Sequence, residues 1–359
     1  MKGNVLVGQS GGPTAVINSS LAGVIQAAKK YGAGKVYGMH YGIEGFLKED
    51  IIDLDEYITC HADLSLLKRT PSAFLGSCRY KLPPIEGNED VYDRMFEIME
   101  KYNIEYFLYI GGNDSMDTIK MLSDYAAKKD KPQKFMGVPK TIDNDLPLTD
   151  HTPGYGSAAK YIATSMKEII RDNASFGASK PTVCVVEIMG RHAGWLTAAS
   201  VLARKFENDN PVLIYLPESA FNTDTFIEDV KKALEHTSNL VVCVSEGIND
   251  GNGTFICELA SDVGVDTFGH KMLTGSGKYL ENLVKEKLGV KVRSIELNVN
   301  QRCSSSMISA TDQEEAIQAG ISGVHFALDG ITGKMIAFHR TEGADYSINY
   351  VPEDVNLIC

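Results

Sequence analysis

The sequence predicts an α/β protein with two lobes, each built on a mainly parallel sheet, and three observations support this. Short apolar runs rich in β-branched residues recur along the chain. Each run is continuous, as in strands that are buried on both faces. Helical stretches separate many of the runs, which is the alternation typical of a parallel sheet covered on both sides. A chain of 359 residues is too long for one small hydrophobic core, so two lobes are expected.

Seven runs are predicted as strands and four stretches as helices. The predicted strands are residues 5–7, 36–39, 106–110, 134–138, 183–188, 212–216 and 240–244. The predicted helices are residues 15–30, 90–102, 115–128 and 158–173. We therefore expect a first lobe at residues 1–150, a second at 151–310, and a C-terminal segment at 311–359 that returns to pack on the lobes.

Composition and charge exclude several classes of protein. The net charge of -12 should repel nucleic acid and anionic membranes, so neither is an expected partner. An anionic substrate would need a locally basic pocket. The seven cysteines are scattered and form no CxxC pair, which argues against a disulfide framework or a structural zinc site and favours the cytoplasm. No segment reaches the roughly 20 apolar residues that span a bilayer, and no signal peptide is apparent.

Glycine-rich polar loops follow three predicted strands, at residues 8–14, 111–115 and 139–145. In open parallel sheets, ligands bind at the carboxyl ends of the strands. Glycines let backbone N–H groups approach a phosphate, and a following helix N-terminus favours negative charge. The loops predict a phosphate-handling face. An ordinary strand–helix turn is the alternative for the first loop, and a helix N-cap is the alternative for Asp114 and Ser115.

The third loop also carries charged groups suited to phosphoryl transfer. Lys140, Asp143 and Asp145 lie within six residues. Transfer to a hydroxyl needs a base for the proton and cations for the charged oxygens. Asp143 or Asp145 is a candidate base or Mg²⁺ ligand, and a solvated Asn/Asp turn is the alternative.

Three arginines in loop contexts supply further cations. Arg79, Arg191 and Arg302 would, with Lys140, form the basic pocket that an acidic protein needs to bind an anion. Each arginine alone is more simply a surface charge, so the prediction depends on the set. His192, next to Arg191, is more simply a structural histidine.

A second phosphate-loop pattern at residues 275–278 is predicted to be only a turn. It reads Gly-Ser-Gly-Lys, but the earlier glycine of a Walker A loop is missing and Tyr279 stands where Ser or Thr is required.

These motifs, in this order along nearly the whole chain, resemble the phosphofructokinase family. The resemblance implies two Rossmann-like lobes with the active site in the cleft between them, the first lobe binding the phosphoryl donor and the second the sugar phosphate. Residues 141–145 match the family's TIDND signature, which makes Asp143 the general base. The implied catalytic residues are Asp143, Lys140, Asp114, Arg79 and Arg191. The implied sugar-phosphate residues are Gly12, Thr141, Ile142, Asp143, Met189, Gly190, Arg191, Glu246 and Arg302. The implied donor residues are Gly11, Gly12, Gly112, Asn113, Asp114 and Ser115, with Asn113 and Asp114 also holding Mg²⁺.

Two positions indicate pyrophosphate rather than ATP as the donor. ATP-dependent members resemble GGDG and PGTIDND, whereas this chain has Asp114 where the last glycine of GGDG would fall and Lys140 where the glycine of PGTIDND would fall. A carboxylate at Asp114 would repel the inner phosphate of a nucleotide. Lys140 adds a cation that stabilises the leaving phosphate.

The chain also departs from the family pattern. Asn113 stands where many members have an Asp near the metal, Thr182 where ATP-dependent bacterial enzymes have a phosphate-binding arginine, and residues 303–306 replace the usual glycines. Ala22 and Gln26 fall where regulated bacterial members carry effector-site arginines, which predicts a non-allosteric enzyme.

The resemblance implies reversible phosphorylation of fructose 6-phosphate by pyrophosphate, in glycolysis or gluconeogenesis, by a homodimer or homotetramer. The alternatives are an ATP-dependent phosphofructokinase, a non-catalytic sugar-phosphate-binding protein and a nicotinamide-dependent oxidoreductase. The missing GxGxxG argues against the last of these.

Overall fold

A computed structural model describes residues 3–176, 180–260 and 275–359. The chain divides into two compact units. Unit 1 contains residues 1–157 and 302–359, and unit 2 contains residues 158–301. The division lies near the predicted boundaries at 150 and 310, and the predicted C-terminal segment belongs to unit 1.

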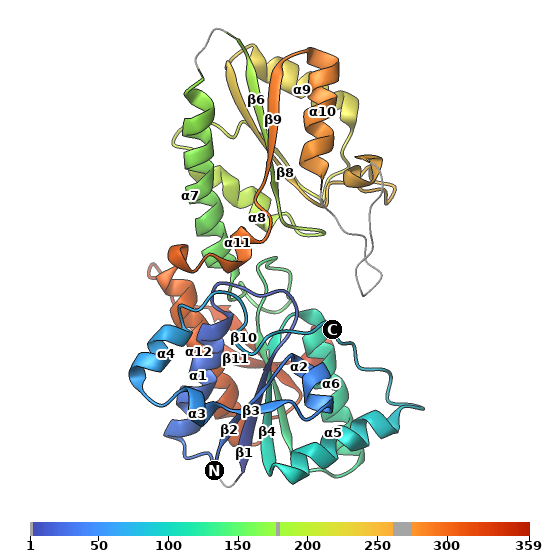
Figure 1. The fold of residues 1–359 in the computed structure, drawn as a ribbon, viewed down its shortest axis with the longest axis vertical. Helices are drawn as coiled ribbons and strands as arrows, with labels where there is room; N and C mark the ends of the chain where they lie inside the picture. Colours follow the sequence, from blue (N-terminus) through green and yellow to red (C-terminus); the bar gives the residue numbers. More distant parts are fainter. Residues whose placement is uncertain (1–2, 177–179, 261–274) are drawn as a thin grey trace. The chain divides into compact units, whose positions relative to one another are not determined.

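Unit 1 is built on a seven-stranded sheet with the order β11-β10-β5-β4-β1-β2-β3 (Figure 1). The strands are β1 (Asn4–Gln9), β2 (Val36–Met39), β3 (Ile51–Asp53), β4 (Ile104–Gly111), β5 (Lys134–Pro139), β10 (Lys334–Arg340) and β11 (Ile348–Asp354). The five central strands are parallel, and β3 and β11 pair antiparallel at the two edges.

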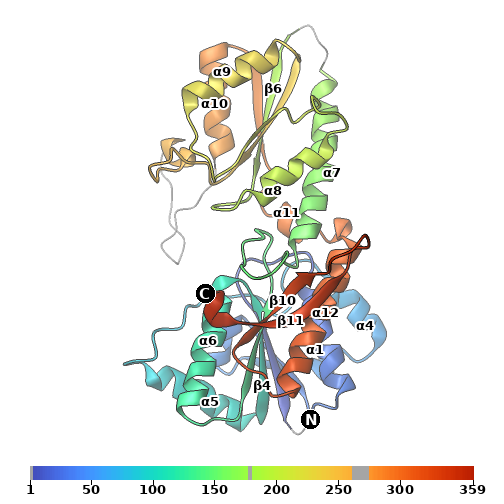
Figure 2. The same cartoon turned by 180° about the vertical axis from the view of Figure 1, so that it is seen from behind.

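Helices cover both faces of this sheet (Figures 1 and 2). They are α1 (Ile17–Lys30), α2 (Gly42–Leu47), α3 (Leu54–Tyr57), α4 (His61–Leu67), α5 (Glu89–Lys101), α6 (Asn113–Lys128) and α12 (Ala310–Leu328), with 3₁₀ turns η3 (Ser305–Met307) and η4 (Val355–Leu357). Successive residues of β4 point to opposite cores. Phe107 and Tyr109 join the cluster under α5 and α6, whereas Leu108 and Ile110 join the cluster under α1 and α12. This explains why the strand reads as a continuous apolar run.

Helices α1 and α12 cross at unusually close range. A Cβ added to Gly320 would lie 2.2 Å from the carbonyl oxygen of Ser20, and one added to Gly23 would lie 2.1 Å from that of Ile317. Both neighbours are backbone atoms, so only glycine fits at either position without a shift of the helices.

This crossing predicts a stability difference between two alanine variants of α12. Gly320→Ala and Gly323→Ala gain the same helix propensity. Only the first places a methyl group against backbone, because Gly323 faces the side-chain end of Leu108 at 3.1 Å. We expect Gly320→Ala to be less stable than Gly323→Ala by about 1–3 kcal/mol in urea unfolding. Equal free energies of unfolding would contradict the close crossing.

Unit 2 contains a four-stranded, fully parallel sheet with the order β7-β8-β6-β9. Its strands are β6 (Thr182–Ile188), β7 (Leu213–Tyr215), β8 (Asn239–Ser245) and β9 (Lys291–Glu296). Its helices are α8 (Trp195–Ala198), η1 (Ala199–Ala203), α9 (Thr223–Leu234), η2 (Ile256–Ala260) and α10 (Ser276–Leu288). Helices α7 (Tyr155–Ala174) and α11 (Asn300–Cys303) span the two boundaries of the division.

All seven predicted strands and all four predicted helices are present, with ends that differ by no more than three residues. The sequence did not predict β3, β9, β10 or β11. The turn predicted at residues 275–278 is wrong, because Gly275 precedes the first turn of α10 and the following residues begin that helix.

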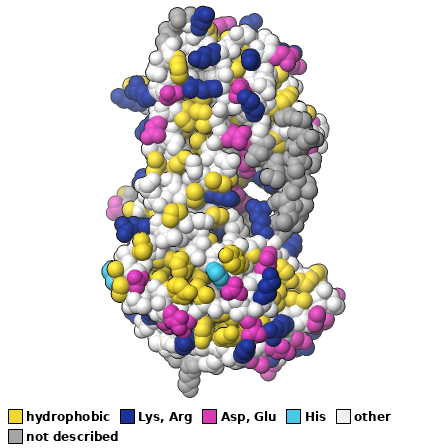
Figure 3. Space-filling view, viewed as in Figure 1, with side chains coloured by type: hydrophobic (Ala, Val, Ile, Leu, Met, Phe, Trp, Pro, Cys, Tyr) yellow, Lys and Arg dark blue, Asp and Glu magenta, His cyan; other side chains and the backbone are white. Residues whose placement is uncertain are grey.

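Charged side chains of both signs are mixed over the surface of the described residues (Figure 3). On the face shown in Figure 3, Lys and Arg side chains are interspersed with Asp and Glu rather than gathered in one basic field. Among the described residues, no helix combines the length and the apolar character needed to cross a membrane.

Candidate active site

The three glycine-rich loops of unit 1 leave neighbouring strands at the carboxyl edge of the sheet. Strands β5, β4 and β1 are adjacent, so their loops lie together. The backbone N–H of Ser10 donates to Ile110 (2.9 Å), and that of Lys140 donates to Gly111 (3.0 Å). A parallel bridge between Ser10 and Cys78 brings the segment before Arg79 to the same edge.

The first loop exposes backbone beside two cations. The ammonium of Lys140 donates to the carbonyl of Gly12 at 2.7 Å, and the hydroxyl of Ser77 donates to the carbonyl of Gly11 at 2.6 Å. Gly11 has a φ of 72°. A Cβ there would lie 3.2 Å from Nζ of Lys140, and one on Gly12 would lie 3.0 Å from Nη1 of Arg302. Glycine is therefore suited to both positions, since it leaves the space beside the cations open.

The second loop forms the N-terminus of α6. Gly112 precedes the helix, and Asn113 and Asp114 are exposed in its first turn. Ser115 is buried, and its N–H donates to the carbonyl of Gly112 at 3.0 Å. A Cβ on Gly111 would lie 1.8 Å from the hydroxyl of Ser115. Ser115 thus shapes the turn, while Asn113 and Asp114 face solvent.

Lys140 is a buried cation with a perturbed pKa. Its exposed fraction is 5%, and burial lowers its pKa to about 8. Asp143 and Asp145 raise this pKa, whereas Arg302 and Arg79 lower it. Five predicted charged residues therefore interact at this edge of unit 1.

The loop that carries Asp143 is held by its own hydrogen bonds. The N–H of Asp143 donates to the hydroxyl of Thr141 at 3.0 Å. The side chain of Thr152 donates to the carbonyl of Thr141 (2.9 Å), and its backbone N–H donates to Oδ1 of Asn144 (3.0 Å). Asn144 adopts a φ of 56°, which asparagine tolerates better than most residues. Hydrogen bonds within unit 1 therefore hold the loop in this conformation.

A buried carboxylate anchors the chain that follows this loop. Asp312, on α12, accepts the N–H of Gly154 and the N–H of Ser157, both at 2.9 Å, and the hydroxyl of Ser157 at 2.5 Å. Burial raises the pKa of Asp312, although these three hydrogen bonds oppose the shift. Gly154 in turn bridges to Thr141. Neither Asp312 nor Thr152 was predicted from the sequence.

Asn113 and Asp114, which are predicted to bind a metal ion, suit an ion that a substrate also helps to bind. Among the described residues, no group of three His, Cys, Asp or Glu side chains could bind an ion alone. Asn113 and Asp114 present exposed oxygens at the start of α6. Mg²⁺ is commonly bound by one or two such ligands together with substrate phosphates and water.

Unit 2 places a second group of predicted residues where β6 and β8 end. The N–H of Glu246 donates to Ile188 (2.8 Å), and that of Gly247 donates to Gly190 (3.2 Å). Gly190 has a φ of 140°, and a Cβ on Gly247 would lie 1.9 Å from the carbonyl oxygen of Arg191. The segments that follow the two strands are therefore joined closely. Met189, Gly190 and Arg191 follow β6, and Glu246 follows β8. His192, which the sequence did not place in the site, is exposed.

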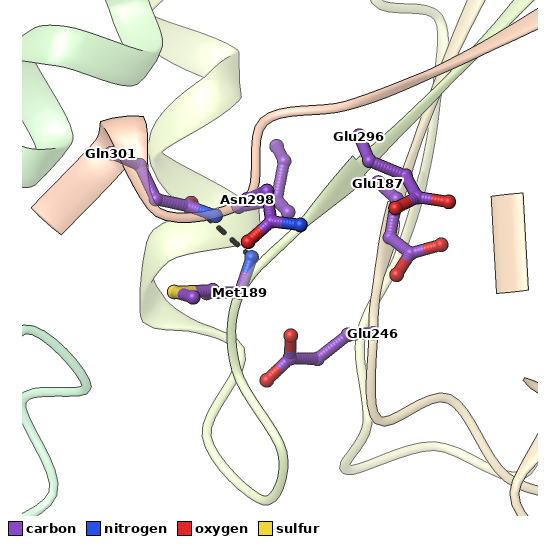
Figure 4. Close-up of a pocket in the computed structure, with 7 residues that line it drawn as sticks. Glu187, Met189, Glu246, Glu296, Asn298 and Gln301 are labelled. Carbon is purple, nitrogen blue, oxygen red and sulfur yellow. Dashed lines mark hydrogen bonds between the residues drawn. The ribbon is translucent and has the colours of Figure 1, made fainter. Parts of the chain in front are cut away.

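A pocket opens beside these strand ends (Figure 4). It is lined by Glu187, Ile188, Met189, Glu246, Glu296, Asn298 and Gln301. Glu187 is buried and accepts the N–H groups of Gly277 (2.6 Å) and Gly275 (3.4 Å) at the start of α10. Burial is the main cause that raises its pKa to about 7, and Glu296 adds to the shift. Glu187 and Gln301 lie close to the predicted residues Met189 and Arg302 in the sequence, but neither was assigned a role in the site.

Known proteins resemble the chain throughout. The phosphofructokinase family model matches residues 4–327. A pyrophosphate–fructose 6-phosphate 1-phosphotransferase of Rhodospirillum rubrum is 42% identical over 355 residues, which are 97% of this chain and 85% of that protein. A sulfofructose kinase of Alkalicoccus urumqiensis is 32% identical, over 95% of this chain and 85% of that protein. The crystal structure of a pyrophosphate-dependent phosphofructokinase of Marinobacter aquaeolei aligns with a TM-score of 0.87 and 37% identity, over 99% of this chain and 83% of that one. This chain belongs to the phosphofructokinase family, and it has that family's α/β fold.

Proposed function

We propose that the chain transfers a phosphoryl group from pyrophosphate to the 1-hydroxyl of fructose 6-phosphate, giving fructose 1,6-bisphosphate and phosphate. The observation that carries this proposal is the buried ammonium of Lys140. It lies against the Gly11–Gly12 backbone, and its pKa responds to Asp143, Arg79 and Arg302. The similarity to a pyrophosphate–fructose 6-phosphate 1-phosphotransferase of Rhodospirillum rubrum and to a pyrophosphate-dependent phosphofructokinase of Marinobacter aquaeolei supports the same reaction.

In this mechanism, the groups of unit 1 act on the donor and the transferred phosphoryl group. Asp143 accepts the proton of the attacking hydroxyl. Lys140 and Arg79, with Arg191 of unit 2, offset the negative charge that develops on the phosphate oxygens. Met189, Glu246 and Arg302 orient the sugar phosphate.

Members of this family generally act with a divalent metal ion. We propose that it is Mg²⁺ here, held by pyrophosphate together with Asn113 and Asp114. When bound, the ion would neutralise charge on the donor oxygens.

The choice of donor follows from two side chains. Asp114 is exposed in the first turn of α6 and would repel the inner phosphate of a nucleotide, which pyrophosphate lacks. Lys140 supplies a cation for the leaving phosphate. We further propose a reversible, non-allosteric enzyme of the cytoplasm that acts as a homodimer or homotetramer.

A donor competition tests the proposal. The purified protein is given fructose 6-phosphate and Mg²⁺ with either pyrophosphate or ATP, and the formation of fructose 1,6-bisphosphate is followed. Turnover with pyrophosphate and little with ATP is the expected result. Turnover with ATP alone would contradict the roles of Asp114 and Lys140, and no turnover with either donor would contradict the proposed function.

A further inference from the structure

Gln301 is a buried side chain in unit 2 with half of its amide unused. Its exposed fraction is 2%, and it is one of the residues that line the pocket beside β6 and β8. Its Oε1 accepts the backbone N–H of Met189 at 3.2 Å. Among the residues that the structure describes, no hydrogen-bond partner lies within reach of its Nε2.

Chemistry fixes which way the amide of Gln301 points. The Met189 backbone N–H is a donor, so only the carbonyl end of the amide can face it. The NH₂ group, which contains Nε2, therefore points away from the Met189 N–H. Figure 4 shows the amide of Gln301 extending from α11 toward Met189 and Asn298. A buried donor without a partner costs about 1–3 kcal/mol, and such groups in native structures usually meet a water or a ligand.

The rest of the pocket is rich in acceptors. Glu187, Glu246 and Glu296 contribute three carboxyl groups. Ionised carboxylates accept hydrogen bonds from sugar hydroxyls but cannot donate to sugar or phosphate oxygens. Glu187, whose pKa is raised to about 7, is a special case, but both of its oxygens already accept backbone N–H groups, from Gly275 and Gly277. Among the seven lining residues, the side-chain amides are those of Asn298 and Gln301, and Asn298 is exposed whereas Gln301 is buried. Gln301 therefore adds a buried amide donor to the lining of an acceptor-rich pocket.

We propose that Gln301 is a binding and positioning residue for the sugar-phosphate acceptor. Its Nε2 donates to an oxygen of the sugar phosphate, while its Oε1 holds the Met189 backbone at the end of β6. This inference rests on the proposed function for the identity of the acceptor. It gives a role to a residue to which the sequence motifs assigned none.

Two substitutions separate the two halves of the amide. Gln301→Glu keeps an oxygen for the Met189 N–H but removes the donor. Gln301→Met removes both hydrogen bonds at a similar side-chain size. Asn298→Asp adds the same negative charge to the pocket and serves as the charge control. Gln133→Met is the control for loss of a buried glutamine, since Gln133 precedes β5 in unit 1 and its Oε1 also lacks a partner in the described part of the chain.

We expect both Gln301 variants to raise the KM for fructose 6-phosphate about 5- to 50-fold, with less than a twofold change in the KM for pyrophosphate. Gln301→Glu should exceed Asn298→Asp in this effect, and Gln133→Met should leave both KM values unchanged. A normal KM for fructose 6-phosphate in Gln301→Glu, with a loss only in Gln301→Met, would assign Gln301 a purely structural role and overturn the proposal. Equal effects of Gln301→Glu and Asn298→Asp, with Gln301→Met normal, would overturn it as well.

Calorimetric titration with fructose 6-phosphate, without any donor, repeats the comparison independently of turnover. If the wild-type protein binds this sugar phosphate through Gln301 but transfers no phosphoryl group, the proposed function fails and this inference stands. If the wild-type protein turns over normally and the Gln301 variants bind as tightly as it does, the inference fails and the proposed function stands.

Discussion

Replacing Asp143 by serine is expected to lower kcat by about 10²-fold or more, because the attacking hydroxyl would lose its general base. The KM values should change much less, since the cations and backbone groups that bind phosphate remain. The Thr141 hydrogen bond to residue 143 uses the backbone N–H, so the loop should keep its conformation in the variant. Initial rates with saturating pyrophosphate and fructose 6-phosphate measure the effect.

Asp145 provides a matched control on the same loop. It is exposed and also interacts with Lys140, but the sequence motif does not assign it the role of base. Asp145→Ser should therefore lower kcat far less than Asp143→Ser. Near-normal kcat in Asp143→Ser, or equal losses in the two variants, would show that Asp143 is not the base.

Replacing Lys140 by methionine is expected to lower kcat with pyrophosphate by about 10²- to 10³-fold, the usual cost of removing one group that stabilises transition-state charge. Folding should not suffer. The substitution removes a cation that is 5% exposed and whose pKa burial lowers to about 8, so the free energy of unfolding at neutral pH should be unchanged or larger. A full rate in Lys140→Met would contradict its place in the site.

The pKa of Lys140 also predicts how the pyrophosphate reaction depends on pH. The ammonium form is the active one, and half of it is lost at a pH of about 8 in the free protein. The value of kcat/KM for pyrophosphate should thus fall about tenfold per pH unit above that point. Lys140→Arg does not titrate in this range, so its remaining activity should lack this alkaline decline. An identical decline in both proteins would assign the titration to another group.

Sequence periodicity predicted the buried strands well because their surroundings are uniform. Every residue of β6 is buried, so it reads as an unbroken apolar run except for Thr182 and Glu187. The strand β9 lies at an edge and has no buried residue. It mixes Lys291 and Arg293 with the apolar Val292 and Ile295, so it contains no such run. The turn residues of the site were predicted for a related reason, since Gly11 and Asn144 occupy a backbone conformation that few other residues tolerate.

The supporting residues of the site could not be predicted in this way. Asp312 holds Gly154 and Ser157 from more than 150 positions along the chain, and nothing near Asp312 in the sequence marks that contact. Gln301 reaches Met189 over a separation of 112 residues. Such contacts depend on how distant segments pack, whereas motifs record only what lies within a few residues.

The division of unit 1 into two separate stretches of chain has a consequence for biosynthesis. Strand β10 pairs with β5, for example Met335 with Gly137, yet all of unit 2 is translated between them. During translation, the edge of β5 that pairs with β10 stays unpaired while unit 2 is synthesised. The residues of unit 2 can form their own sheet in that time. Domains generally fold as units in the order of their synthesis, and unpaired strand edges promote aggregation. We therefore expect the incomplete sheet of unit 1, with β5 unpaired at its edge, to be prone to aggregation during synthesis.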